Sequence, residues 1–191
     1  AMQLLERYFE TSFSAPDGIK KLRELILTLA MQGKLVPQNL NDQPAGELLK
    51  EIAAEKKRLV KKGKIKAQNP LPEIKPEEVP YELPTGWEWV RFGCIAQHNS
   101  GKTLDKGRNT GQYRDYITTS NLYWGRFELD SVRQMLIRDE ELEKCTARQG
   151  DLLICEGGEA GRAAVWPYNK EICFQNHIHR ARFYCDIDSY Y

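Results

Sequence analysis

The chain has 191 residues, of which 41% are hydrophobic and 29% charged, and its formal net charge is +1. This composition is typical of a soluble globular protein with a real core, and no apolar run reaches the ~18 residues that a membrane helix needs. Five cysteines without tight pairing argue against a disulfide framework and favour reduced thiols in a cytoplasmic protein.

The near-neutral sum hides an uneven distribution of charge. Residues 1–80 hold 14 Lys and Arg against 11 Asp and Glu, whereas residues 81–191 hold 14 against 16. A nucleic-acid reader with this balance must gather its basic groups on one face or borrow positive charge from a partner.

The first predicted element is an amphipathic helix that follows residue 17. Ile19, Leu22, Ile26 and Leu29 recur at helical spacing and form one apolar stripe. Ser14 and Asp17 are expected to cap its start. Gly33 is expected to end the helix in a left-handed conformation.

A second helix is predicted between Pro44 and Gly63, with an apolar stripe formed by Leu48, Leu49, Ile52, Leu59 and Val60. Its acidic residues come early and its basic residues late, as the helix dipole favours. We interpret the late basic run as a solvated helix end in preference to a DNA contact. Two helices bury little by themselves, so we expect them to pack on each other, on the following domain or on a partner chain.

From Asn69 onward five prolines remove periodicity, which indicates an extended linker over residues 67–86. After it the hydrophobic period becomes two, which is typical of short strands separated by polar loops. The expected strands are 87–92, 114–120, 133–137, 151–156, 163–166 and 177–184, with one helical turn at DEELEKC.

The sequence therefore predicts an α+β protein. It divides into a helical region at 1–66, the linker at 67–86, and a β-rich domain with an irregular sheet and long polar loops at 87–191. The last residues, DIDSYY, are typical of a helix start, so we expect the chain to stop inside a larger protein.

The Gly-rich run at 157–161 matches no phosphate-binding motif, because a strand-like segment follows it and a phosphate cradle needs a helix there. We interpret it as a tight connection between strands. Cys173, His177, His179 and Cys185 lack any standard zinc spacing. No catalytic constellation stands out, so we expect a non-enzymatic chain; a metal-dependent nuclease stays as an alternative.

The loops of the β-rich domain carry side chains that suit phosphates and base edges. Polar loops also occur simply where a β domain meets water, so composition alone does not decide. We expect these loops to converge on one surface. The candidate DNA-binding residues are Lys102, Thr103, Lys106, Arg108, Tyr113, Arg114, Thr118, Thr119, Ser120, Asn121, Tyr123, Trp124, Arg126, Arg162, Gln175, Asn176 and His177.

Five segments carry a family resemblance in their order along the chain: LRELILTLAMQGKLVPQNLNDQPAGELLKEIAAEKKRL, ELPTGWEWVRFG, YITTSNLYWG, GDLLICEGGEAGRAAV and CFQNHIHRARF. Together they resemble the DNA-specificity (S) subunit of Type I restriction–modification systems. The resemblance implies an N-terminal helical piece, with partner or assembly helices, followed by most of a first target recognition domain. It also implies that the Gly-rich run is a structural turn and that residues 175–177 lie beside the reading surface.

The same resemblance implies the function. The chain would read one half of a bipartite site in double-stranded DNA in the cytoplasm, without membrane contact, and would dock modification subunits. A restriction and translocation subunit would complete the complex. No cofactor is expected on this chain; S-adenosylmethionine, ATP and Mg²⁺ are expected on the partner subunits. The competing hypothesis is an assembly scaffold that does not bind DNA.

Overall fold

The computed structural model describes residues 2–39 and 41–190 of the chain. The fold divides into two compact units, one formed by Ala1–Glu51 with Pro72–Val90 and the other by Ile52–Leu71 with Arg91–Tyr191. The α+β class is confirmed. The two long N-terminal helices lie in the first unit, and every strand lies in the second.

The first unit contains the helices α1 (Met2–Ser14) and α2 (Gly18–Met31) and the short 3₁₀ helix η1 (Pro76–Glu78). The sequence pattern did not single out α1. The expected cap of α2 is wrong, because Asp17 adopts the left-handed conformation and its side chain makes no capping hydrogen bond. The end at Gly33 is confirmed. Gly33 has a φ of 63°, and the next amide donates to the Leu29 carbonyl at 2.8 Å.

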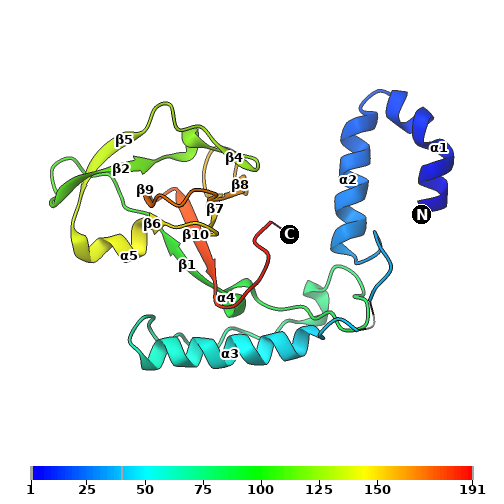
Figure 1. Ribbon diagram of the computed structural model, residues 1–191, viewed down its shortest axis with the longest axis horizontal. Helices are drawn as coiled ribbons and strands as arrows, with labels where there is room; N and C mark the ends of the chain where they lie inside the picture. The colour runs from blue at the N-terminus through cyan, green and yellow to red at the C-terminus, as the bar shows by residue number, and fades with distance from the viewer. Residues whose placement is uncertain (1, 40, 191) are drawn as a thin grey trace. The chain divides into compact units, whose positions relative to one another are not determined.

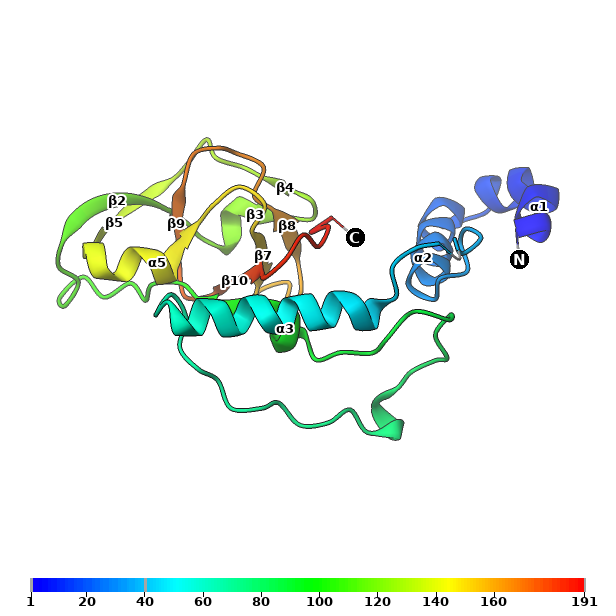
Figure 2. The ribbon, with the colours of Figure 1, turned by 60° about the horizontal axis from the view of Figure 1, so that its bottom comes forward.

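The second expected helix is confirmed as α3 (Ala45–Lys61), and Gly63 ends it with a φ of 67°. The division between the units falls within this helix. In the first unit the Ala45 amide donates to the Gly86 carbonyl at 2.8 Å. In the second unit Ile52 is 2% exposed, and Lys56 Nζ donates to the Gly93 carbonyl at 3.3 Å. The C-terminal half of α3 is thus part of the β-rich unit, as Figure 2 shows.

The second unit is built from two four-stranded sheets and a small hairpin (Figure 1). The first sheet is antiparallel, in the order β1 (Ala96–Ser100), β10 (Ile178–Phe183), β7 (Leu152–Cys155), β8 (Ala163–Val165). The second sheet has the order β5 (Arg133–Ile137), β2 (Gln112–Ile117), β9 (Ile172–Phe174), β6 (Thr146–Ala147), and its β2–β9 pair is parallel. The hairpin joins β3 (Leu122–Tyr123) to β4 (Arg126–Phe127).

One expected strand is wrong: residues 87–92 form no strand, and the short helix α4 (Phe92–Ile95) begins where it was expected to end. Its alternating aromatic residues serve packing within the first unit instead. The Trp87 indole N–H donates to Gln38 Oε1 at 2.9 Å, and the Trp89 ring meets that of Tyr81 edge-on at 5.0 Å. Such packing explains why aromatic residues alternate in this sequence although no strand forms.

The expected strand 133–137 is confirmed with the same ends, as β5, and the other expected strands are confirmed with shifted ends. The turn at DEELEKC is formed by the 3₁₀ helix η3 (Asp139–Glu141) and α5 (Leu142–Cys145). The sequence pattern did not reveal β1 and β9. The β1 sequence AQHNS is polar because it lies at the edge of its sheet, and β9 has only three residues, all buried. Neither shows the alternation that marks a half-buried strand.

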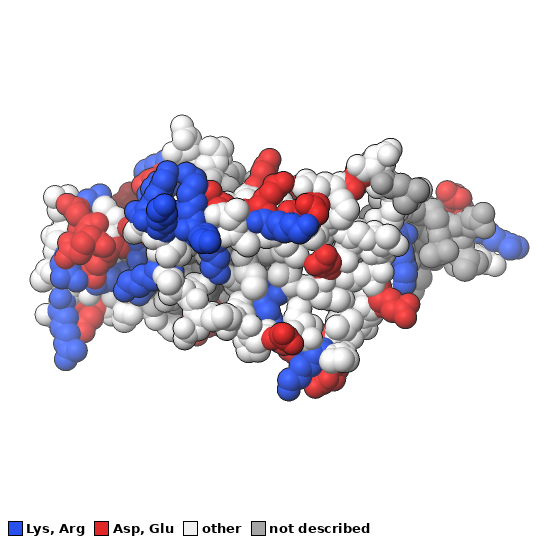
Figure 3. All heavy atoms as spheres, turned by 90° about the horizontal axis from the view of Figure 1, so that it is seen from below, with Lys and Arg blue, Asp and Glu red and all other residues white. Residues whose placement is uncertain are grey.

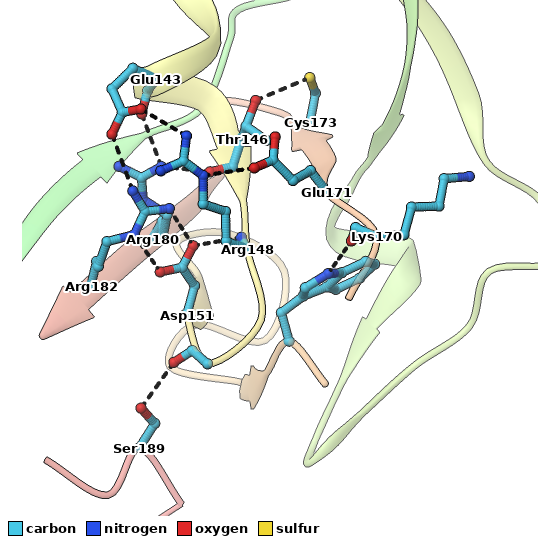
Figure 4. A network of polar contacts seen from close by, with 12 residues as sticks. Glu143, Thr146, Arg148, Asp151, Lys170, Glu171, Cys173, Arg180, Arg182 and Ser189 are labelled. Carbon is cyan, nitrogen blue, oxygen red and sulfur yellow. Dashed lines mark hydrogen bonds and ion pairs between the residues drawn. The ribbon is translucent and has the colours of Figure 1, made fainter. Parts of the chain in front are cut away.

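The hydrophobic core of the second unit lies between its two sheets, where Ile117, Leu153, Phe174 and Ile178 are fully buried. Arg180 is also fully buried, beside this core. Its Nη1 donates to the carbonyls of Glu143 and Thr146, at 3.0 and 2.5 Å (Figure 4). Burial in this environment lowers the pKa of Arg180 to about 10.

Among the described residues, no helix is long and apolar enough to cross a membrane. Within the same residues, no group of three or more His, Cys, Asp or Glu side chains could hold a metal ion. All five cysteines are free thiols.

Candidate nucleic-acid interface

Three loops of the second unit meet where β1 ends and β10 begins. The Lys102 amide donates to the Phe174 carbonyl at 2.9 Å, and the Asn176 amide donates to the Lys102 carbonyl at 3.0 Å. The Gln175 amide donates to the Ile117 carbonyl at 3.0 Å. These backbone bonds fix the loop after β1 and the loop after β2 beside residues 175–176.

The turn after β2 is held by Asn121. Its Oδ1 accepts from the Thr118 amide at 2.9 Å, and its Nδ2 donates to the carbonyls of Glu128 and Ser131, at 2.9 and 3.1 Å. Asn121 and Thr118 are buried, at 5% and 6% exposure, whereas Ser120 is exposed. The first two side chains therefore organise the loop, and only the rim of the turn is open to a ligand.

The β3–β4 hairpin presents an aromatic ring between two cations. The guanidinium carbons of Arg126 and Arg162 lie 4.7 and 5.0 Å from the centre of the Tyr123 ring. Arg162 also donates to the Thr119 carbonyl at 2.5 Å, which joins the hairpin to the turn after β2. At the hairpin tip the Trp124 side chain is 62% exposed.

Two carboxylates of the Gly-rich loop enter this arrangement, and neither was among the predicted site residues. Glu159 accepts from the Trp124 indole N–H at 2.8 Å and lies 3.4 Å from Arg162. Glu156 lies 3.9 Å from His177 and 3.2 Å from His179. The acidic residues on both sides of Gly157 and Gly158 were a visible signal in the sequence, but the prediction favoured basic, hydroxyl and amide side chains as DNA ligands.

The structure thus brings together most of the predicted site residues. We call this set, with the two carboxylates, the reading surface. It comprises Lys102, Thr118, Thr119, Ser120, Asn121, Tyr123, Trp124, Arg126, Glu156, Glu159, Arg162, Gln175, Asn176 and His177. The Gly-rich run lies within it as the connection between β7 and β8, where Gly158 and Gly161 have φ values of 76° and 87°.

The remaining predicted residues lie on β2, which pairs with β5, and in the loop before it. Lys106 and Tyr113 line an open groove of about 460 Å³. The Arg108 side chain is 90% exposed, at 3.7 Å from Asp105. Arg114 pairs with Asp139 at 2.7 Å, and the Thr103 carbonyl accepts from the Asn109 amide group. The Arg108 and Asn109 contacts lie within the loop, and the Arg114–Asp139 pair joins β2 to η3.

Carboxylates neutralise the cations of the reading surface. Lys102 lies 2.5 Å from Glu141, Arg126 pairs with Glu128, and Arg162 contacts Glu159. The Lys102 ammonium, together with Arg138, lowers the pKa of Glu141 to about 2. The surface therefore offers many directed hydrogen-bonding groups and little net charge.

The positive charge of the second unit lies elsewhere. Residues 91–191 hold 14 basic and 14 acidic side chains, whereas residues 52–71 hold seven basic ones against Glu55 alone. We call these seven the basic strip: Lys56, Lys57, Arg58, Lys61, Lys62, Lys64 and Lys66. Figure 3 shows Lys and Arg side chains gathered over this end of α3. Lys56 contacts Gly93 and the Tyr184 ring, which lie at the Ala96–Phe183 end of β1 and β10, opposite the reading surface.

No protein-family model matches the chain. In an alignment of 171 residues that covers 84% of the chain, it is 66% identical to the specificity subunit of the Type I restriction enzyme EcoEI of Escherichia coli. The chain is homologous to part of a Type I specificity subunit. Over 82 residues, 43% of its length, the chain is also 70% identical to the EcoAI specificity subunit of the same species. It spans only 28% and 14% of the length of these two relatives.

Two solved structures resemble the segment weakly. The HsdS subunit of Thermoanaerobacter tengcongensis matches 72% of this chain and 31% of its own length, with 19% identity and a TM-score of 0.40. A structure of a Type I restriction–modification system, described for complex assembly and conformational transition, matches 89% of this chain and 37% of its own, with 17% identity and a TM-score of 0.42.

Proposed function

We propose that this chain is the DNA-reading part of a Type I specificity subunit and recognises one half of a bipartite sequence in double-stranded DNA. The observation that carries the proposal is the convergence of four loops, far apart in sequence, on one rigid edge of the β-rich unit. Their side chains are of the types that contact phosphates and base edges. Homology to two specificity subunits supports the same role.

In this proposal the chain catalyses nothing. Methyl transfer, translocation and cleavage belong to the modification and restriction subunits of a cytoplasmic complex, which would hold S-adenosylmethionine, ATP and Mg²⁺. The charge distribution supports such a division. Because the reading surface carries little net charge, much of the electrostatic affinity for DNA has to come from partner subunits.

A second candidate function, docking of a partner, rests on the first unit. Phe9, Phe13, Leu27 and Met31 of α1 and α2 are 46–62% exposed. Exposed apolar side chains in this number mark an interaction surface. Docking of a modification subunit there is compatible with DNA reading by the second unit, because the two functions use different units.

The test of DNA reading is an Asn176→Ala substitution in the full-length subunit, assembled with its partners. We expect a loss of about 1–3 kcal/mol in affinity for the preferred duplex and little change on a shuffled duplex, because base contacts carry sequence information and phosphate contacts do not. An electrophoretic binding assay measures both. An equal loss on the two duplexes would contradict base reading by this loop.

A further inference from the structure

Glu156 differs from the carboxylates that pair with the cations of the reading surface. It follows β7 directly, and its amide donates to the His177 carbonyl at 2.9 Å, which fixes its backbone. Its side chain is 59% exposed. Glu128, Glu141 and Glu159 each neutralise a basic side chain of this surface, whereas the ion-pair partners of Glu156 among the described residues are imidazoles.

Two histidines, hydrogen-bonded in series, position this carboxylate. His98 Nε2 and His179 Nδ1 are 2.6 Å apart, and the two rings are nearly parallel, at 13°, with their centres 4.7 Å apart. His179 Nε2 lies 3.2 Å from Glu156 Oε2. One proton assignment satisfies both contacts with neutral rings: His98 Nε2–H donates to His179 Nδ1, and His179 Nε2–H donates to Glu156. Burial, with His179 adding to it, lowers the pKa of His98, which favours this neutral form.

The support leaves one oxygen of Glu156 open. Both imidazole contacts use Oε2, and Oε1 has no hydrogen bond or ion pair with any described residue. A carboxylate held at a DNA-facing surface repels phosphates, so it weakens binding unless it accepts a hydrogen bond from the DNA. In the major groove the acceptable donors are the exocyclic amino groups of cytosine and adenine. Adenine places its N7 acceptor beside that amino group, which disfavours a carboxylate, whereas cytosine does not.

We propose that Glu156 is a specificity-determining residue that accepts a hydrogen bond from the N4 amino group of a cytosine, with His179 and His98 as its positioning residues. This inference rests on the proposed function. The two hydrogen-bonded histidines hold the carboxylate in one orientation before DNA arrives, so little side-chain entropy is lost on binding.

The experiment selects bound sequences from randomised duplexes, using the full-length subunit with its partners, as wild type and as Glu156→Gln. Wild type should select cytosine at one position. Glu156→Gln should lower the relative affinity for that cytosine by about tenfold or more and raise that for adenine, because a glutamine amide pairs with the N6 and N7 edge of adenine. The base preferences at the other positions of the duplex should not change.

The matched control is Glu140→Gln, which removes the same charge from an exposed carboxylate of η3 that pairs with Arg138. It should leave every base preference unchanged. His98→Phe keeps an aromatic ring but removes the donor, so it should weaken the same cytosine preference to a smaller degree.

Two outcomes overturn the inference while leaving the proposed function intact. One is a Glu156→Gln profile identical to that of wild type. The other is an equal loss of affinity for all duplexes, which would make Glu156 a structural residue. A wild-type complex that selects no sequence at all would overturn the proposed function itself.

Discussion

At the scale of single residues, the structure separates side chains that hold the reading surface together from those that are exposed on it. Asn121 looked from the sequence like an adenine reader, because Asn suits that base. In the structure its amide satisfies one backbone N–H and two carbonyls inside the loop. Arg126 and Trp124 remain exposed by contrast. The difference between these residues is burial. The sequence pattern does not reveal whether a single polar residue in a loop is buried.

Asn121→Ala should therefore act on stability. We expect the free energy of unfolding to fall by about 2–3 kcal/mol, because the substitution leaves buried backbone groups unpaired. Chemical denaturation measures the change. Thr103→Ala, at an exposed loop position, is the control and should change stability by less than about 0.5 kcal/mol. A change as small as that of the control would show that the loop does not depend on Asn121.

Glu141 gives a pH dependence of stability. Lys102 first, then Arg138, lowers its pKa to about 2 in the folded chain, whereas an unfolded Glu has a pKa of about 4.3. Its ionised form therefore stabilises the fold above about pH 4.5, and this contribution disappears as the pH falls toward 2.

Replacing Glu141 with Gln should flatten the decline in unfolding free energy between about pH 4.5 and 2. The slope should change by up to about one bound proton, in denaturation curves recorded at successive pH values. Parallel declines in the two proteins would refute the ion pair with Lys102.

At the scale of elements, regular patterns were predictable and short or edge elements were not. α2 and α3 follow from their apolar stripes and their glycine ends, because those signals are local. β1 was missed because an edge strand tolerates polar residues, and the strand expected at 87–92 was wrong because its aromatic residues pack within the first unit. Within the site, the loops were predictable from their polar composition. Their ion pairs were not, since Lys102 and Glu141 are far apart in sequence.

The basic strip at the end of α3 gives a prediction about this element. Lys56, the first residue of the strip, lies at the end of β1 and β10 opposite the reading surface. We therefore expect that neutralising Lys61, Lys62 and Lys64 to Gln leaves the salt dependence of DNA binding unchanged. If a lysine of the strip did bind a DNA phosphate, its removal would reduce the slope of log affinity against log salt by about 0.9.

The measurement is a titration of the assembled complex at several salt concentrations. Lys106→Gln with Arg108→Gln, in the exposed loop before β2, provides the comparison. A slope reduced by about 2.7 in the triple α3 variant would place DNA on the strip and would contradict its assignment as a solvated helix end.

At the scale of the whole molecule, the chain divides its tasks between units. The first unit exposes apolar helix side chains, and the second gathers directed polar groups on one edge of a rigid two-sheet core. In the proposed function both features are used, since the first unit would be held by partners and the second would tell bases apart. This division of tasks implies that DNA specificity can be changed without altering assembly.

The most direct test of DNA reading by the second unit exchanges residues 91–190 for the corresponding segment of a specificity subunit that has another target, within the assembled complex. Selection from randomised duplexes then reports both halves of the recognised site. We predict that one half changes to that of the donor while the other half stays. A chimera that assembles but keeps both original halves would contradict the proposal that this unit reads DNA.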